Sequence, residues 1–403
     1  MITRRFLLQS AAAAAAYSAQ GFRAARAENA PGVTDTEIKI GQTMPYSGPL
    51  SAYGVIGRTE AAYFRMINDQ GGIDGRKLNL ISVDDAYSPP KTVEQVRRLV
   101  EQKQVAFLFQ TLGTPCNLAV RQYLNDNKVP TLFVTTGASV FADPQHFLWT
   151  MGFIPNYQTE ARIFAKHILA TKPTAKIAVL YQNDGFGKDY LIGLKDVLGP
   201  GRASMIVKEA SYEVSEPTVD SQVATLQGSG ADVFVIVAVS KFAAQAIRKS
   251  YDIGWNAIRY MTYVSQSLVG TLKPAGLDKS KGVISALWAK DVNDPRWKDD
   301  PGLQSWKAFT DKYMSPIEFA DSNAAEGFTA AGTMVQALKQ CGNDLSRDNI
   351  LKQAANLKDL ELPLLLPGIK INTSPTNYSP IRQMQLAAFN GESWELFGDV
   401  LSD

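Results

Sequence analysis

The chain has 403 residues, of which 45% are hydrophobic and 20% charged, and its formal net charge is +2. These values are typical of a soluble globular protein, and the length favours two domains over one small core. After the N-terminal segment, no apolar run approaches the length of a transmembrane helix.

The N-terminal segment is predicted to be an export signal. Arg4 and Arg5 precede an apolar, alanine-rich stretch at 6–19, and Ala25-Arg26-Ala27 has the small-x-small pattern of a cleavage site. The stretch is too short and too rich in alanine to favour a membrane anchor. We therefore expect residues 1–27 to be removed near Ala27 and the mature protein to lie in the periplasm. The arginine pair resembles a twin-arginine signal, although the general secretory route also accepts a basic start.

The apparent basicity of the chain belongs to this segment. Its removal takes away four arginines and no acids, so that Lys+Arg falls from 41 to 37 against 39 Asp+Glu and the net charge becomes −2. A nucleic-acid partner is therefore not expected.

Strand and helix patterns alternate along the first half of the chain. Residues 37–43, 77–84, 105–109, 129–134 and 147–151 are predicted strands. Helices are expected around 61–67, at 91–103 and from Thr114 onward. Residues 152–155 look like a crossing into a second unit.

The second unit restarts the alternation. Strands are predicted at 176–181, 205–211, 231–239 and 258–262, and helices at 157–170, after the turn at 183–187, at 219–227 and at 241–251. Helices at 303–313, 324–339 and 347–355 follow, and strands at 382–388 and 394–397 flank a turn at Asn390-Gly391. This double alternation predicts an α/β fold of two doubly wound lobes.

One strand-to-helix turn is a candidate anion site. The apolar run 105–109 leads through Leu112 and Gly113 into a helix for which Thr114 suits the N-cap and Pro115 the first position. Gly113 lets a ligand approach the backbone, and helix N-termini attract anions. We expect this turn to hold a ligand carboxylate; an ordinary turn without a ligand is the alternative.

Enzyme signatures are missing. The two histidines have no partners at metal-ligand spacing, and no nucleotide or metalloprotease motif is present. The stretch Gly137-Ala138-Ser139 is one residue short of a nucleophile elbow, because Phe141 stands where glycine is needed. No enzyme activity, metal or cofactor is therefore expected. Of the two cysteines, Cys116 and Cys341, the first is interpreted as a small buried residue in preference to a reactive thiol.

Turns rich in small and hydroxyl-bearing residues follow the carboxyl ends of the predicted strands. In the first lobe they lie at 46–48, 112–114 and 135–139, and in the second at 184–187, 238–240 and 263–265. This edge of an open parallel sheet is where ligands bind. Two lobes that face each other across these edges would form a cleft able to close by hinge motion.

At this point the chain resembles the leucine/isoleucine/valine-binding family, the substrate-binding proteins of ABC importers. The resemblance rests on four stretches: 38–41 with 47–49, 67–76, 83–86 and 183–187. It implies a monomeric type I periplasmic binding protein that delivers a small molecule to an inner-membrane ABC permease. It also implies three crossing segments, with lobe one at 31–152 plus 284–375 and lobe two at 153–283 plus 376–403.

The resemblance carries binding roles to several positions. The turns that grip the ligand carboxylate in the family match Gly113-Thr114 and Gly137–Ser139, and the aromatic positions match Tyr53 and Phe186. The acid that holds the ligand ammonium is replaced, since Tyr263 or Val264 stands in its place. The family's tyrosine-bearing turn is replaced by 238–240, and its disulfide, which would join positions 87 and 112, is absent.

Without that acid, a buried ammonium would cost several kcal/mol. We therefore expect an aromatic or apolar acid without an α-amino group. The alternative is that an acid such as Asp184 or Glu160 reaches the ammonium of an amino acid, or that an amide is bound. The residues predicted to bind the ligand are Tyr46, Ser47, Tyr53, Leu112, Gly113, Thr114, Thr136, Gly137, Ala138, Ser139, Tyr157, Phe186, Ser240 and Tyr263.

Two other functions are alternatives, and the sequence does not separate the first of them from a transport receptor. A ligand sensor would use the same two-lobed receptor with a signalling partner in place of a permease. An exported serine hydrolase would use Ser139 as its nucleophile and would need a base.

Overall fold

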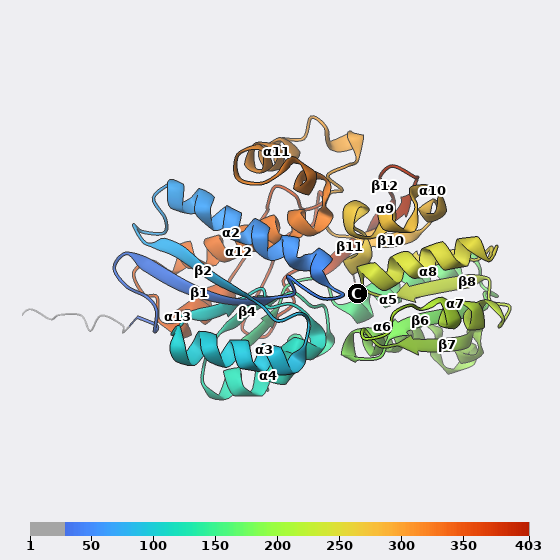
Figure 1. The fold of residues 1–403 in the computed structure, drawn as a ribbon, viewed down its shortest axis with the longest axis horizontal. Coiled ribbons are helices and arrows are strands. Elements are labelled where there is room, and N and C mark those ends of the chain that lie inside the picture. The colour runs from blue at the N-terminus through green and yellow to red at the C-terminus, as the bar shows by residue number, and fades with distance from the viewer. Residues whose placement is uncertain (1–28, 403) are drawn as a thin grey trace, which may run out of the picture.

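Two separate sheets, each covered by helices on both faces, form the two lobes of the molecule (Figure 1). The computed structural model describes residues 29–402. The expected export signal at 1–27 lies outside these residues. The α/β class and the two-lobed architecture are as the sequence predicts.

The first sheet has the strand order β2-β1-β3-β4-β5, with all neighbours parallel. Its strands are β1 (Glu37–Met44), β2 (Lys77–Asp84), β3 (Phe107–Phe109), β4 (Thr131–Val134) and β5 (Thr150–Gly152). The short central strands are completely buried, as expected for a parallel sheet with helices on both faces.

Helices from distant parts of the chain cover this sheet. One face carries α2 (Gly54–Asp69) and α12 (Ser322–Cys341), and the other carries α3 (Pro89–Arg97) and α4 (Thr114–Asp126) (Figure 1). Successive side chains of β3 point to opposite faces of the sheet and so contact both helix layers. Phe109 packs on Phe64 of α2, whereas Leu108 packs with side chains of α3 and α4. Two further helices, α11 (Pro301–Tyr313) and α13 (Arg347–Ala354), complete the lobe.

The second sheet has the order β12-β11-β10-β9-β8-β6-β7. Its strands are β6 (Ile177–Gln182), β7 (Ile206–Tyr212), β8 (Val233–Val237), β9 (Ile258–Met261), β10 (Ile284–Leu287), β11 (Gln383–Phe389) and β12 (Trp394–Ser402). Strands β6 to β10 are parallel to their neighbours, whereas β11 and β12 are added antiparallel. The helices are α5 (Tyr157–Thr171), α6 (Gly185–Arg202), α7 (Asp220–Gln227), α8 (Ser240–Asp252), α9 (Lys273–Ala275) and α10 (Leu277–Ser280).

The position of β10 shows that the expected boundary between the lobes at residue 284 is wrong. The sequence reading assigns residues from 284 onward to lobe one and predicts no strand there. In the structure Ile284–Leu287 pairs with both β9 and β11, so this strand belongs to the second sheet. Within residues 29–402 the chain then crosses between the sheets after β5, after β10 and before β11.

Candidate functional site

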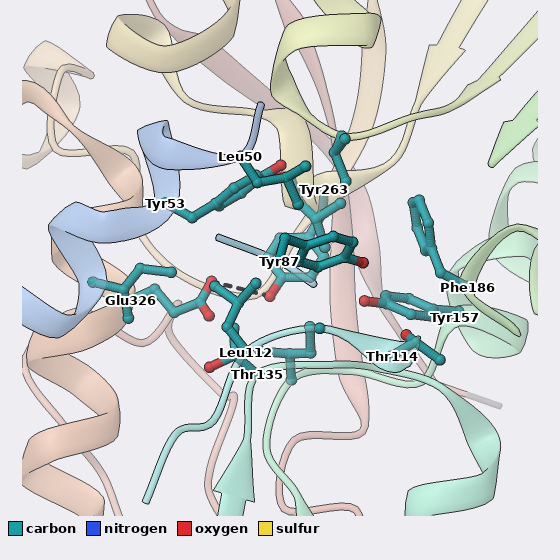
Figure 2. A pocket seen from close by; sticks show the side chains of 15 residues that line it. Leu50, Tyr53, Tyr87, Leu112, Thr114, Thr135, Tyr157, Phe186, Tyr263 and Glu326 are labelled. Carbon is teal, nitrogen blue, oxygen red and sulfur yellow. Dashed lines mark hydrogen bonds between the residues drawn. The ribbon is translucent and has the colours of Figure 1, made fainter. Parts of the chain in front are cut away.

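A cavity of about 450 Å³, part of it open to solvent, lies between the two lobes at the carboxyl ends of the strands (Figure 2). The predicted residues that line it are Tyr53, Leu112, Gly113, Thr114, Tyr157, Phe186 and Tyr263. The lining residues outside the predicted set are Leu50, Ile56, Tyr87, Thr135, Ile154, Val239, Val264 and Glu326. Among these lining residues none is Lys, Arg or His, so no basic side chain meets a ligand anion.

The N-terminus of α4 forms one polar part of the wall. Gly113 is the N-cap and Thr114 the first helical residue, so the helix begins one residue earlier than the sequence predicts. The Thr114 hydroxyl lies 2.7 Å from the Thr136 hydroxyl, and no acceptor among residues 29–402 receives a hydrogen bond from the Thr114 N–H. A helix N-terminus with a hydroxyl and a free amide is suited to an anion.

Gly113 permits a close contact beside this helix start. Its φ is +101°, in the left-handed region that favours glycine, and a Cβ at this position would lie 2.3 Å from Cε2 of Tyr87. The Tyr87 ring therefore occupies the space that a side chain at 113 would need. The Tyr87 hydroxyl accepts a 3.3 Å hydrogen bond from Gln182 of the second lobe.

Aromatic rings form the part of the wall that the second lobe contributes. Tyr157 begins α5 and meets Phe186 of α6 edge to face, with ring centroids 4.9 Å apart. Gly137 supports this arrangement, because a Cβ there would lie 2.7 Å from Cδ1 of Tyr157. Figure 2 shows Tyr157 and Phe186 on the same side of the cavity as Thr114.

Glu326 is the acidic residue of the cavity. It comes from α12, and its side chain is buried, with the residue 8% exposed. Oε2 accepts a 3.2 Å hydrogen bond from the Tyr263 hydroxyl, whereas Oε1 has no partner among residues 29–402. Burial raises the pKa of the Glu326 carboxyl to about 7. In Figure 2 it lies on the opposite side of the cavity from Thr114.

The two acids that the sequence suggests as ammonium partners are engaged elsewhere. Asp184 caps α6, where Oδ1 accepts hydrogen bonds from the N–H groups of Phe186 and Gly187. Glu160 accepts from the Tyr263 N–H at 2.8 Å and from the Tyr190 hydroxyl, and neither acid lines the cavity. Burial raises the pKa of Glu160 to about 8.

Hydrogen bonds across the cleft hold the lobes together around the cavity. The Tyr53 hydroxyl, in the first lobe, donates to the Val264 carbonyl and accepts from the Ser240 N–H, each at 3.0 Å. Ser240 thus contributes its backbone N–H to closure and does not line the cavity, and its buried Oγ has no partner in the described chain.

Ser139 also faces a protein carboxylate. Its N–H and hydroxyl donate to Asp189 of α6 at 2.6 Å and 2.9 Å, and Gln158 binds the same pair of residues. The N–H and hydroxyl of Ser139, which the resemblance assigns to a ligand carboxylate, are therefore bonded between the lobes. The histidines lie elsewhere, since His146 pairs with Asp143 and His167 with Tyr260, so neither is bonded to Ser139 as a catalytic base.

The remaining predicted residues lie outside the cavity wall. The Tyr46 hydroxyl lies 2.6 Å from Ser82 Oγ, and Ser47 donates to Asp84 at 2.5 Å. Thr136 bonds to Thr114 and accepts from the Ala138 N–H. The predicted residues that do not line the cavity are thus Tyr46, Ser47, Thr136, Gly137, Ala138, Ser139 and Ser240.

Both cysteines are packing residues, as the sequence indicates for Cys116. Cys116 and Cys341 are both buried and free. Burial raises the pKa of each thiol to about 12, which keeps the thiols protonated and unreactive at neutral pH.

The sequence matches the family model of the periplasmic binding proteins over residues 37–393. The chain belongs to this family. The family consists of receptors that bind small molecules, and those of ABC importers pass them to a membrane permease. Within residues 29–402, no helix of this binding protein is both long and apolar enough to span a bilayer, and no group of His, Cys, Asp and Glu could hold a metal.

Relatives of known sequence support the same family. The protein is 24% identical over 315 residues to Leu/Ile/Val-binding protein homolog 1 of Brucella abortus, covering 76% of this chain and 80% of the relative. It is 25% identical over 333 residues to an amino acid binding protein of Pseudomonas aeruginosa, covering 80% and 82%.

Two solved structures share the fold of this binding protein. One is a branched-chain amino acid ABC transporter protein from Thermus thermophilus with bound valine, with a TM-score of 0.82, 16% identity and coverage of 92% and 98%. The other is a solute-binding protein of an ABC transporter from R. palustris in complex with benzoate, with a TM-score of 0.76, 19% identity and coverage of 91% and 98%. At these identities the likeness concerns the fold.

Proposed function

We propose that this protein is the solute receptor of an ABC importer and that its lobes close on a small carboxylate with an aromatic or apolar body. The observation that carries this proposal is the composition of the cavity wall, which combines aromatic and aliphatic side chains with the N-terminus of α4. The ligand carboxylate would accept hydrogen bonds from the hydroxyl and N–H of Thr114, in place of a basic residue.

The remaining parts of the proposal follow from the family. The mature receptor would be a periplasmic monomer, cleaved near Ala27, that docks on an inner-membrane permease. A sensor would use the same cavity with a signalling partner, and a permease gene beside this one would favour transport. The solved relatives bound to valine and to benzoate show that this fold accommodates both amino acids and aromatic acids.

An amino acid is the second candidate ligand, and Glu326 favours it. This buried carboxyl reaches the cavity with one oxygen unpartnered, and it offers an ammonium the counter-charge that is missing at Val264. An α-ammonium would have to reach Glu326 from the same carbon that carries the carboxylate.

A thermal-shift screen of the mature protein tests the proposal. Benzoates, phenylpropanoids and short fatty acids are compared with leucine, glutamate and amides. A ligand that binds the folded protein raises the free energy of unfolding by about 2.7 kcal/mol when its concentration is a hundred times Kd. The melting temperature therefore rises with the ligand concentration. Stabilisation by the simple acids is expected. A response confined to α-amino acids would replace the first candidate by the second.

A further inference from the structure

The cavity has a second polar end, formed by Glu326, that differs from the first in its chemistry. Thr114 supplies hydrogen-bond donors at the N-terminus of α4. Glu326 supplies acceptor oxygens from α12, which covers the opposite face of the first sheet (Figure 1). The two groups also lie on opposite sides of the cavity in the close-up view (Figure 2).

Glu326 is buried without full compensation. Its Oε2 accepts from the Tyr263 hydroxyl, and its Oε1 is left without a partner in the described part of the chain. Neighbouring Glu60, on α2, is completely buried and is itself an acid, with its Oε2 bound to Gln42 and its Oε1 unpartnered. Buried acceptors of this kind are costly unless a donor reaches them.

The protein offers no cation for this purpose. Among residues 29–402 Glu326 takes part in no ion pair. Lys290, which lines a smaller pocket together with Glu326, donates from its Nζ to Asp300 at 2.7 Å and to the Pro363 carbonyl at 3.0 Å. The missing donor must therefore come from what fills the cavity.

We propose that Glu326 selects ligands that carry a hydrogen-bond donor, a hydroxyl or a protonated amine, at the end remote from their carboxylate. This inference rests on the proposed function, because it takes the carboxylate to bind at Thr114. A rigid aromatic acid with a distal hydroxyl satisfies both ends of the cavity, with its ring between them among Tyr157, Tyr263 and Phe186. An α-amino acid does not, because its ammonium is attached next to the carboxylate.

A matched series of acids tests this selection. Calorimetric Kd values are measured for benzoate, 4-hydroxybenzoate, 4-methoxybenzoate and 4-(aminomethyl)benzoate, and for 3-phenylpropanoate with its 4-hydroxyl derivative. The titrations are made at pH 8, above the pKa of about 7 that burial gives Glu326, so that the carboxyl is mostly ionised. The hydroxylated acid is then expected to bind about tenfold or more tightly than its methoxy analogue, since a hydrogen bond to a charged group is gained. The ratio of the two constants is the readout, because a general loss of stability does not change it.

Two variants at the same position separate the outcomes. Glu326→Met removes both acceptor oxygens and should bring the hydroxyl-to-methoxy ratio close to one. Glu326→Gln keeps a neutral acceptor, so it should retain part of the preference for the hydroxyl and lose any preference for the aminomethyl acid. Glu94→Gln, on the exposed surface of α3, is the control and should behave as the parent protein.

The inference and the proposed function fail in different ways. Equal ratios in the parent protein and in Glu326→Met would overturn the inference while leaving the carboxylate receptor intact. Binding of none of these acids would remove the proposed function itself. Larger affinity losses for unsubstituted benzoate than for the hydroxylated acid in Glu326→Met would also contradict the selection.

Discussion

At the scale of single residues, the polar groups of the cavity have distinct roles. Thr114 presents donors to the cavity, whereas Thr136 behind it holds the Thr114 hydroxyl. Glu326 presents acceptors, whereas two other buried acids, Glu60 and Glu160, bind within the protein. The residues that touch a ligand can therefore be separated experimentally from those that only support them.

Substitution of Thr114 by valine should weaken every carboxylate ligand. The change keeps the shape of the side chain and removes a hydroxyl that is expected to donate to a charged group, a loss of about 1.5–3 kcal/mol or roughly tenfold to a hundredfold in Kd. Calorimetric titration of the acid that binds best gives the comparison. Thr225→Val, on the exposed surface of α7, is the matched control, and unchanged affinity in Thr114→Val would remove this hydroxyl from the site.

The buried acids predict how stability depends on pH. Burial raises the pKa of Glu160 to about 8 from an ordinary value of 4.5. The folded protein thus holds a proton that the unfolded chain releases between these values, so stability falls as pH rises through this window. For one proton the slope reaches about 1.4 kcal/mol per pH unit. Glu326 and Glu60 contribute with the same sign.

Urea unfolding at pH 5 and pH 8 measures this dependence. The parent protein should be less stable at pH 8, and Glu160→Gln should show a smaller difference between the two conditions. Some dependence should remain, because Glu326 and Glu60 are unchanged. An identical difference in both proteins would show that Glu160 does not carry the expected proton.

At the scale of secondary-structure elements, the start of η3 (Ser139–Phe141) connects the lobes. Ser139 donates from its N–H and its hydroxyl to Asp189 of α6, and it does not line the cavity. We therefore expect Ser139→Ala to weaken the closed arrangement and to lower the affinity for all ligands by a similar factor, about threefold to tenfold for one lost hydrogen bond.

Comparison of several ligands distinguishes this role from direct contact. Ser139→Ala and Asp189→Asn should reduce the affinity for aromatic and aliphatic acids in parallel. If Ser139→Ala weakened carboxylates selectively and Asp189→Asn did not, Ser139 would be a ligand contact, as its resemblance to the family suggests.

The sequence predicted the elements that have strong patterns and missed those that depend on distant contacts. The run 231–239 is apolar enough to identify β8, and the glycine-rich turn 183–187 marks the start of α6. Strand β10 is short and contains Ser285 and Ala286, so its pairing with β9 and β11 has no periodic signal.

The residues of the candidate site also divide into those indicated by nearby sequence and those brought together by distant contacts. The strand-to-helix pattern alone indicates Thr114, whereas the family resemblance indicates Tyr53 and Phe186, and all three line the cavity. Glu326 lies in an alanine- and glycine-rich helix far along the chain, and only the packing of α12 beside α2 brings it to the cavity. A single acid in an otherwise buried helical pattern was the available signal. A turn pattern also does not reveal that Ser139 finds a partner in Asp189 of the other lobe.

At the scale of the whole molecule, the two lobes enclose a cavity whose ends have opposite hydrogen-bonding character. Closure places Tyr53 against Val264 and Ser240, and Tyr263 against Glu326, so that both lobes contribute to the wall. A small acid held at Thr114 would be enclosed by these contacts, which is the arrangement that an importer requires of its receptor.

A crystal structure of the mature protein with the tightest acid from the screen tests this account most directly. We expect the carboxylate within hydrogen-bond distance of the hydroxyl and N–H of Thr114, and the body of the ligand among Tyr157, Phe186 and Tyr263. A carboxylate bound instead at the Glu326 end, or a ligand outside the cavity between the lobes, would contradict it.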